Sequence, residues 1–147
     1  LYKSYSFRMR NTISKFFLLT IGLIISSCTS VSEKDLTNLN GYWEIEKVES
    51  NGETFTPRGG AILVDFYQLD STTGYRKKLA PSFNGNYKSS EDQFDFSVVN
   101  IEGSFYIEYK EALQPWKEKI ISINATQLEL EHSDKTYVYK RHEKISL

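Results

Sequence analysis

The sequence predicts an all-β fold, a small antiparallel up-and-down barrel of about eight strands. Apolar and polar residues alternate over short stretches after residue 38, which is typical of half-buried strands. Gly, Pro, Asn and Asp separate these stretches, and none of ten or more residues has a helical apolar period. A meander this long must protect its edges, and closure into a barrel removes them. A two-sheet β-sandwich is the alternative that composition leaves open.

The expected strands follow from the alternation. The stronger patterns span 41–49, 61–68, 93–99, 104–110, 127–133 and 136–141, and weaker ones lie near 75–78, 86–88 and 116–123. Asn51-Gly52 is the best hairpin signal in the chain. Within 61–68 we expect Phe66 on the inner face and Tyr67 on the outer face. Aromatic residues make up 14% of the chain, enough large rings to fill or line a barrel.

The N-terminal segment has the pattern of a secretory signal peptide, which we assign to residues 1–27. Four basic residues precede an apolar stretch at 16–25, which is too short to span a bilayer. We expect translation to start at Met9, with 1–8 read in from upstream. This segment holds four of the 18 basic and none of the 19 acidic residues, so the rest carries a formal charge of −5. That acidic body argues against nucleic acid as a partner.

Ile25-Ser26-Ser27-Cys28 resembles the lipobox of bacterial lipoproteins. The resemblance implies cleavage before Cys28, a diacylglyceryl thioether on its thiol and N-acylation, with chains such as palmitate. Two or three acyl chains would anchor the protein to a lipid bilayer. Residues 28–37 are polar and are interpreted as the lipidated tether. The alternative is an ordinary secretory signal followed by an incidental thiol. Thr29 after the cysteine favours the outer membrane, and the sequence leaves open whether the periplasmic or the surface face.

Gly41-Tyr42-Trp43 resembles the G-x-W signature that opens the first strand of lipocalins. Together with 116–120, 128–130 and 137–141, it is similar to bacterial lipocalin-like lipoprotein domains over 38–143. The resemblance implies a lipocalin-like β-barrel, which we assign to 38–147, with Arg141 packed over Trp43 to close its floor. The sequence departs from the full lipocalin pattern because it lacks a clear T-D-Y segment and a C-terminal helix.

No catalytic constellation is visible, so we expect a non-enzyme without metal or cofactor. The chain has one Cys and two His, and it lacks G-x-S-x-G, P-loop and G-x-G-x-x-G motifs. The sequence leaves open whether two side chains, those of Glu118 and His132, face the interior of the barrel. Glu118 is either a buried carboxylate that needs Arg141 or a tyrosine hydroxyl, or it is in water with Ile121 and Ile123 inside. His132 points inward or lies at the rim.

The aromatic content favours a barrel that binds a small hydrophobic or amphipathic ligand in the bacterial cell envelope. The candidate lining residues are Phe66, Phe94, Phe96, Phe105, Tyr109, Tyr137 and Tyr139. The alternative is a non-catalytic structural or interaction lipoprotein, in which the same rings fill a solid core. Its contact with another envelope protein would use Tyr42, Tyr67 and Tyr106, which we expect on the outer face.

Overall fold

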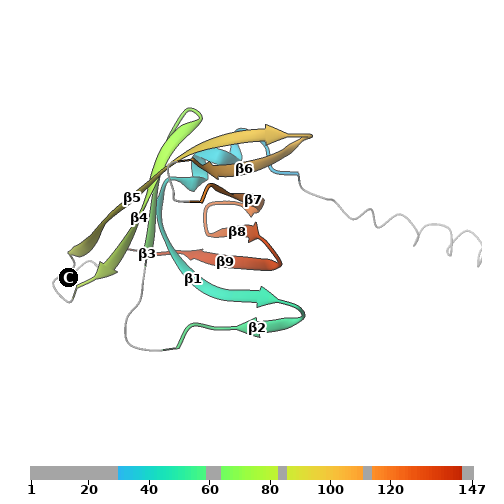
Figure 1. Ribbon diagram of the computed structural model, residues 1–147. Helices are drawn as coiled ribbons and strands as arrows, with labels where there is room; N and C mark the ends of the chain where they lie inside the picture. The colour runs from blue at the N-terminus through green and yellow to red at the C-terminus, as the bar shows by residue number, and fades with distance from the viewer. Residues whose placement is uncertain (1–29, 59–63, 83–85, 111–113, 144–147) are drawn as a thin grey trace, which may run out of the picture.

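The computed structural model describes residues 30–58, 64–82, 86–110 and 114–143. The signal segment 1–27 and Cys28 lie outside the described residues. A 3-10 helix, η2, precedes nine strands (Figure 1). The elements are η2 (Asp35–Leu39), β1 (Gly41–Ser50), β2 (Glu53–Phe55), β3 (Val64–Asp70), β4 (Thr73–Pro81), β5 (Tyr87–Ile101), β6 (Ser104–Tyr109), β7 (Trp116–Ile123), β8 (Gln127–His132) and β9 (Lys135–Arg141).

The strands form a closed antiparallel barrel, which confirms the predicted fold class. Strands β1 and β3 to β9 pair in chain order, and β9 pairs back with β1 to complete the ring of eight. The closing pair runs from Trp43 opposite Arg141 to Ser50 opposite Lys135, with one bulge after Ile45. Because a single sheet closes on itself, the sandwich alternative is wrong.

Strand β2 lies outside the ring and pairs with the part of β1 that β3 leaves free. The first half of β1 pairs with β3, whereas Val48 to Ser50 pair with β2 along the same edge. Asn51 and Gly52 connect β1 to β2 with φ of 52° and 80°, the two positive values that a type I′ hairpin turn requires. The predicted hairpin is therefore confirmed. The patterns near 86–88 and 93–99 belong to one strand, β5.

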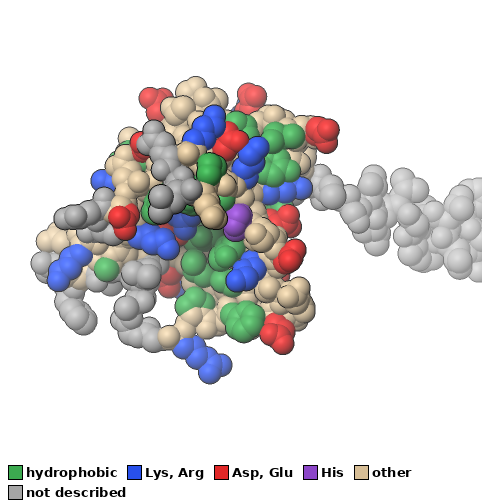
Figure 2. Space-filling model, viewed as in Figure 1, with side chains coloured by type: hydrophobic (Ala, Val, Ile, Leu, Met, Phe, Trp, Pro, Cys, Tyr) green, Lys and Arg blue, Asp and Glu red, His purple; other side chains and the backbone are tan. Residues whose placement is uncertain are grey.

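One end of the barrel is closed by η2. Its Leu36 and Leu39 belong to the hydrophobic core, although we assigned residue 36 to the tether. Ser32 donates from its backbone N and its Oγ to Asp35 Oδ2, at 2.9 and 2.6 Å, which ties the turn before η2 to the first residue of the helix. The turns β3–β4, β5–β6 and β7–β8 lie at this same end. Strands β3, β5 and β7 begin at the opposite end, which we call the mouth. In Figure 2 hydrophobic side chains are visible at the centre of one face, among charged side chains of both signs.

The inner face of β3 differs from the prediction. Tyr67 is fully buried and Asp65 is buried, and they lie opposite Gly41 and Trp43 of β1. Phe66 lies on the outer face, where its ring is 4.9 Å from Tyr42. The predictions that Phe66 lines the interior and that Tyr67 faces outward are therefore wrong. Both predictions assumed that the more apolar of the two faces of β3, the one with Phe66, points inward. Closure of the barrel instead turns the face with Asp65 and Tyr67 inward.

Candidate functional site

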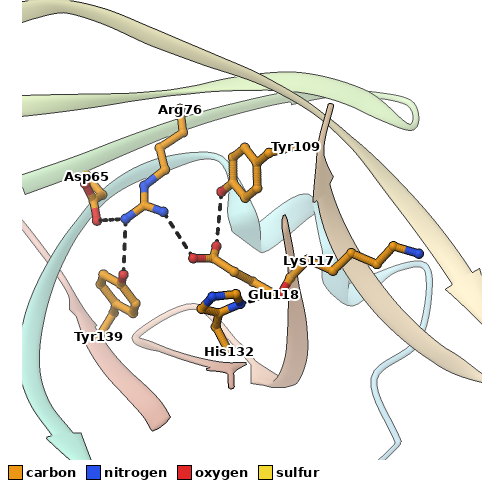
Figure 3. Close-up of polar contacts among 7 residues, drawn as sticks. All are labelled: Asp65, Arg76, Tyr109, Lys117, Glu118, His132 and Tyr139. Atoms are coloured by element: carbon orange, nitrogen blue, oxygen red, sulfur yellow. Dashed lines mark hydrogen bonds and ion pairs between the residues drawn. The ribbon is translucent and has the colours of Figure 1, made fainter. Parts of the chain in front are cut away.

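A cluster of charged side chains lies inside the barrel, and Arg76 of β4 is its centre (Figure 3). Its Nη2 donates to Asp65 Oδ2 of β3 at 2.6 Å, and its Nη1 lies 3.4 Å from Glu118 Oε1 of β7. All three residues are at most 8% exposed. Removing three charges from water is costly, so each needs its partners. The cluster therefore links three strands across the barrel interior.

Two tyrosine hydroxyls complete this network. Tyr109 donates to Glu118 Oε2 at 3.1 Å, and Arg76 Nη2 lies 3.4 Å from the hydroxyl of Tyr139. The guanidinium also lies over the ring of Tyr67, 5.3 Å from its centroid. Two buried donors are left over, because Arg76 Nε and the hydroxyl of Tyr67 have no hydrogen-bond partner among the described residues. A buried donor of this kind is expected to bind water or a ligand oxygen.

Burial changes the acid–base behaviour of these tyrosines. Desolvation raises the pKa of Tyr67, Tyr109 and Tyr139 above the usual value of a phenol. For Tyr109 the neighbouring Glu118 charge acts in the same direction, while Arg76 opposes it. The three hydroxyls therefore stay protonated, and they act as neutral donors and acceptors.

These shifts predict how stability depends on alkaline pH. Because the folded state holds the three protons more tightly than the unfolded state, their contribution is complete below the unfolded-state pKa of about 10 and is lost above it. Titration followed by tyrosinate absorbance should show exposed tyrosines ionising first. The three buried ones should ionise only as near-ultraviolet circular dichroism is lost. Ionisation of every tyrosine in one step, with that signal intact, would contradict the burial described here.

The predicted lining residues other than Phe66 lie on the inner face. Phe96, Phe105, Tyr109 and Tyr139 belong to the hydrophobic core, and Phe94 and Tyr137 are half-buried and pack against it. Trp116, which we did not predict as a lining residue, stacks on Tyr109 with ring centroids 4.3 Å apart. It also meets Phe94 edge-on at 5.8 Å. Trp116 and Tyr137 therefore lie toward the mouth, whereas Phe105 lies beside η2.

At the closed end, the Arg141 guanidinium lies 3.7 Å from the centroid of the Trp43 ring. It donates to three backbone carbonyls, those of Asn38 at 2.7 Å, Asn40 at 2.8 Å and Ala125 at 3.0 Å. Trp43 is fully buried, and its Nε1 donates to the carbonyl of Leu39 at 2.9 Å. These contacts hold β1 and β9, the first and last strands of the ring, against η2.

Glu118 is buried, and its partners are Tyr109 and Arg76. Arg141, which we considered as its donor, lies at the closed end instead. His132 lies near Glu118 in Figure 3, and its Nδ1 is 2.9 Å from the carbonyl of Lys117. Because a carbonyl only accepts, Nδ1 carries the proton in this contact. Sequence reasoning missed Asp65 and Arg76. The sequence signal that could have indicated them was weak. Asp65 is the one carboxylate in the apolar pattern 61–68, and Arg76 is the one Arg in the weak pattern near 75–78.

Other features of the described residues are less informative about chemistry. Two surface depressions, of about 440 and 390 Å³, lie over the outside of β4 to β6 and beside η2. Neither is lined by the three charged residues of the cluster. Among the described residues, no group of three or more His, Cys, Asp or Glu is arranged to hold a metal ion. No helix in that part of the chain is long and apolar enough to cross a membrane.

Comparison with known proteins gives similarities of fold only. No protein-family model and no curated protein matches the chain. A lipocalin-like protein from Bacteroides uniformis is 11% identical, with a TM-score of 0.45 over 71% of this chain and 99% of that one. An uncharacterized protein from Bacteroides eggerthii is 10% identical, with a TM-score of 0.46 over the same shares. Lobster apocrustacyanin A1 is 14% identical, with a TM-score of 0.44 over 75% of this chain and 64% of that one. These values carry no conclusion about function.

Proposed function

We propose that the protein is a membrane-anchored lipoprotein of the bacterial cell envelope whose barrel binds a small amphipathic ligand. The observation that carries this proposal is the charged cluster inside a surround of aromatic rings. The rings of Phe94, Trp116 and Tyr137 are half-buried near the mouth and offer apolar contact. Deeper in, the cluster offers oriented polar groups, including the unpartnered Arg76 Nε. Apolar walls with a few placed polar groups are typical of small-molecule sites.

Stability alone gives little reason for such a cluster. A buried ion triad is often no more stabilising than apolar side chains of similar volume, because desolvation offsets the attraction between the charges. The other buried side chains among the described residues are apolar or aromatic. A polar cluster retained in that setting favours a role in holding the polar part of a ligand.

Binding of octan-1-ol to the full chain, followed by titration calorimetry, tests the proposal. We expect one molecule per barrel. Tyr137→Ala removes a half-buried inner ring and should weaken binding roughly tenfold, which corresponds to about 1.4 kcal/mol. Tyr106→Ala is the matched control, because Tyr106 alternates with the buried Phe105 and Ile107 and so faces outward. Absence of stoichiometric binding, or equal weakening by both variants, would reject a ligand site in the barrel.

The anchor has a separate test. Cys28→Ala removes the only thiol of the chain, so no thioether can form. We expect the variant to leave the membrane fraction, or to accumulate as the larger unprocessed precursor. Cell fractionation and the mass of the protein check both outcomes. Unchanged size and unchanged fractionation would show that Cys28 is not the anchor.

A second function is favoured by an aromatic group on the outer face. Tyr42 stacks on Tyr87 at 5.0 Å and contacts Phe66 at 4.9 Å, and Phe66 lies 6.0 Å from Tyr75. Aromatic side chains are enriched at protein interfaces, so this surface suits contact with another envelope protein. Cross-linking in intact cells, compared between the native chain and Tyr42→Ala, tests this role. Identical cross-linked products would count against it.

A further inference from the structure

The interior cluster carries an excess of negative charge. Asp65 and Glu118 oppose one guanidinium, that of Arg76, which gives a formal charge of −1 with His132 neutral. Lys78 lies opposite Asp65 in the strand register, but its side chain is exposed. An anionic group that entered the barrel would therefore meet net repulsion in a setting where water screens little.

The carboxylates also have unused capacity to accept hydrogen bonds. An ionised carboxylate offers about four acceptor positions. Asp65 accepts through Oδ2 alone among the described residues. Glu118 accepts one bond from Tyr109 at 3.1 Å and a long contact of 3.4 Å from Arg76. A ligand group with several N–H donors could therefore donate hydrogen bonds to the free acceptor positions of the two carboxylates.

Aromatic rings beside the cluster add a second attraction for positive charge. Trp116 and Glu118 lie two residues apart on the same face of β7, and Trp116 stacks on Tyr109 at 4.3 Å. Phe94 meets Trp116 edge-on and lies opposite Arg76 in the register. Ring faces attract cations, and Trp does so most strongly. The carboxylates and the rings thus favour the same class of polar group.

We propose that the ligand of the barrel is an amphiphile with an amine head, and that the cluster discriminates against fatty-acid anions. This inference rests on the proposed function. The ammonium would bind the acceptor positions of Asp65 and Glu118 that Arg76 leaves free, beside the Trp116 and Tyr109 rings, and the apolar chain would extend along the inner rings. Arg76 holds the two carboxylates in place through its Nη atoms, which are already shared among three oxygens, and its unpartnered Nε alone does not offset the two carboxylate charges that an anionic head would meet.

The test compares three probes of equal chain length on the full chain at neutral pH. Octylamine is then cationic, octanoate anionic and octan-1-ol neutral. We expect octylamine to bind at least about tenfold tighter than octanoate, the difference that one charge-assisted hydrogen bond supplies. Glu118→Gln keeps the size and the acceptor for Tyr109 but removes a charge, so it should reduce this ratio about tenfold. Asp65→Asn provides the same test if the first variant does not fold.

A control variant separates the interior from the acidic surface. Glu108 alternates with the buried Ile107 and Tyr109, and its ion pairs with Lys110 and Lys117 at 3.2 and 3.0 Å lie on the outer face. Glu108→Gln should leave the ratio unchanged. If Glu108→Gln lowers the affinity of octylamine relative to octanoate as much as Glu118→Gln does, the preference comes from the acidic surface, and the inference is overturned. Octanoate binding as tightly as octylamine would overturn it too, while octan-1-ol binding would still support the proposed function. Failure of all three probes would reject both.

Discussion

Arg76→Met should lower the free energy of unfolding by about 3–5 kcal/mol, the range for removing one partner of a buried ion pair. The side chain is replaced by one of similar length without charge, so Asp65 and Glu118 remain buried and lose their common donor. Tyr139 also loses its contact with Nη2. Denaturation with urea at neutral pH, followed by circular dichroism, measures the loss.

Two further variants show whether the charges are the cause. Lys77→Met is the matched control, because Lys77 is the next residue on β4, lies on the outer face and should change stability by less than about 0.5 kcal/mol. Combining Arg76→Met with Asp65→Leu and Glu118→Leu removes the whole triad and should recover most of the stability. If Arg76→Met unfolds like the native chain, the cluster does not have the buried geometry described here.

Trp43→Ala should lower the free energy of unfolding by about 3–5 kcal/mol, as expected for a fully buried large aromatic. The variant leaves a cavity at the closed end and an unpartnered carbonyl on Leu39. It also removes the ring that lies under Arg141 at 3.7 Å. Thermal and urea unfolding should both show the loss.

Trp116→Ala is the matched control, since the second tryptophan is half-buried near the mouth and should cost clearly less. Arg141→Lys tests the other partner. A lysine cannot direct three donors to the carbonyls of Asn38, Asn40 and Ala125, so we expect a loss of about 1–3 kcal/mol. If Trp43→Ala costs no more than Trp116→Ala, the closed end is not a centre of stability.

Much of the fold is predictable from local patterns. Alternation identified the strands of the ring, and Asn51-Gly52 identified the β1–β2 hairpin, because both signals depend on neighbouring residues alone. Strand β2 was not predicted, since its three residues are all exposed and have no apolar face. The two alternatives for β7 each held in part. A bulge between Ile120 and Ser122 shifts the alternation, so that Glu118, Ile120 and Ile123 are all buried.

The charged cluster was only partly predictable. Glu118 was recognised as a candidate because it shares a face with Trp116 and Ile120. Asp65 and Arg76 were missed because the choice of inner face depends on closure of the whole barrel. Burial of Asp65 is tolerated only through Arg76, which is 11 residues away on the next strand and held at 2.6 Å. Pairings of this kind arise from tertiary structure and leave no local pattern.

Native mass spectrometry of the full chain purified from membranes shows whether the barrel binds an amphipathic small molecule. We expect a complex with one small molecule per chain, released on unfolding and depleted in Tyr137→Ala but retained in Tyr106→Ala. A ligand-free mass that does not change when octan-1-ol or octylamine is added would contradict this expectation.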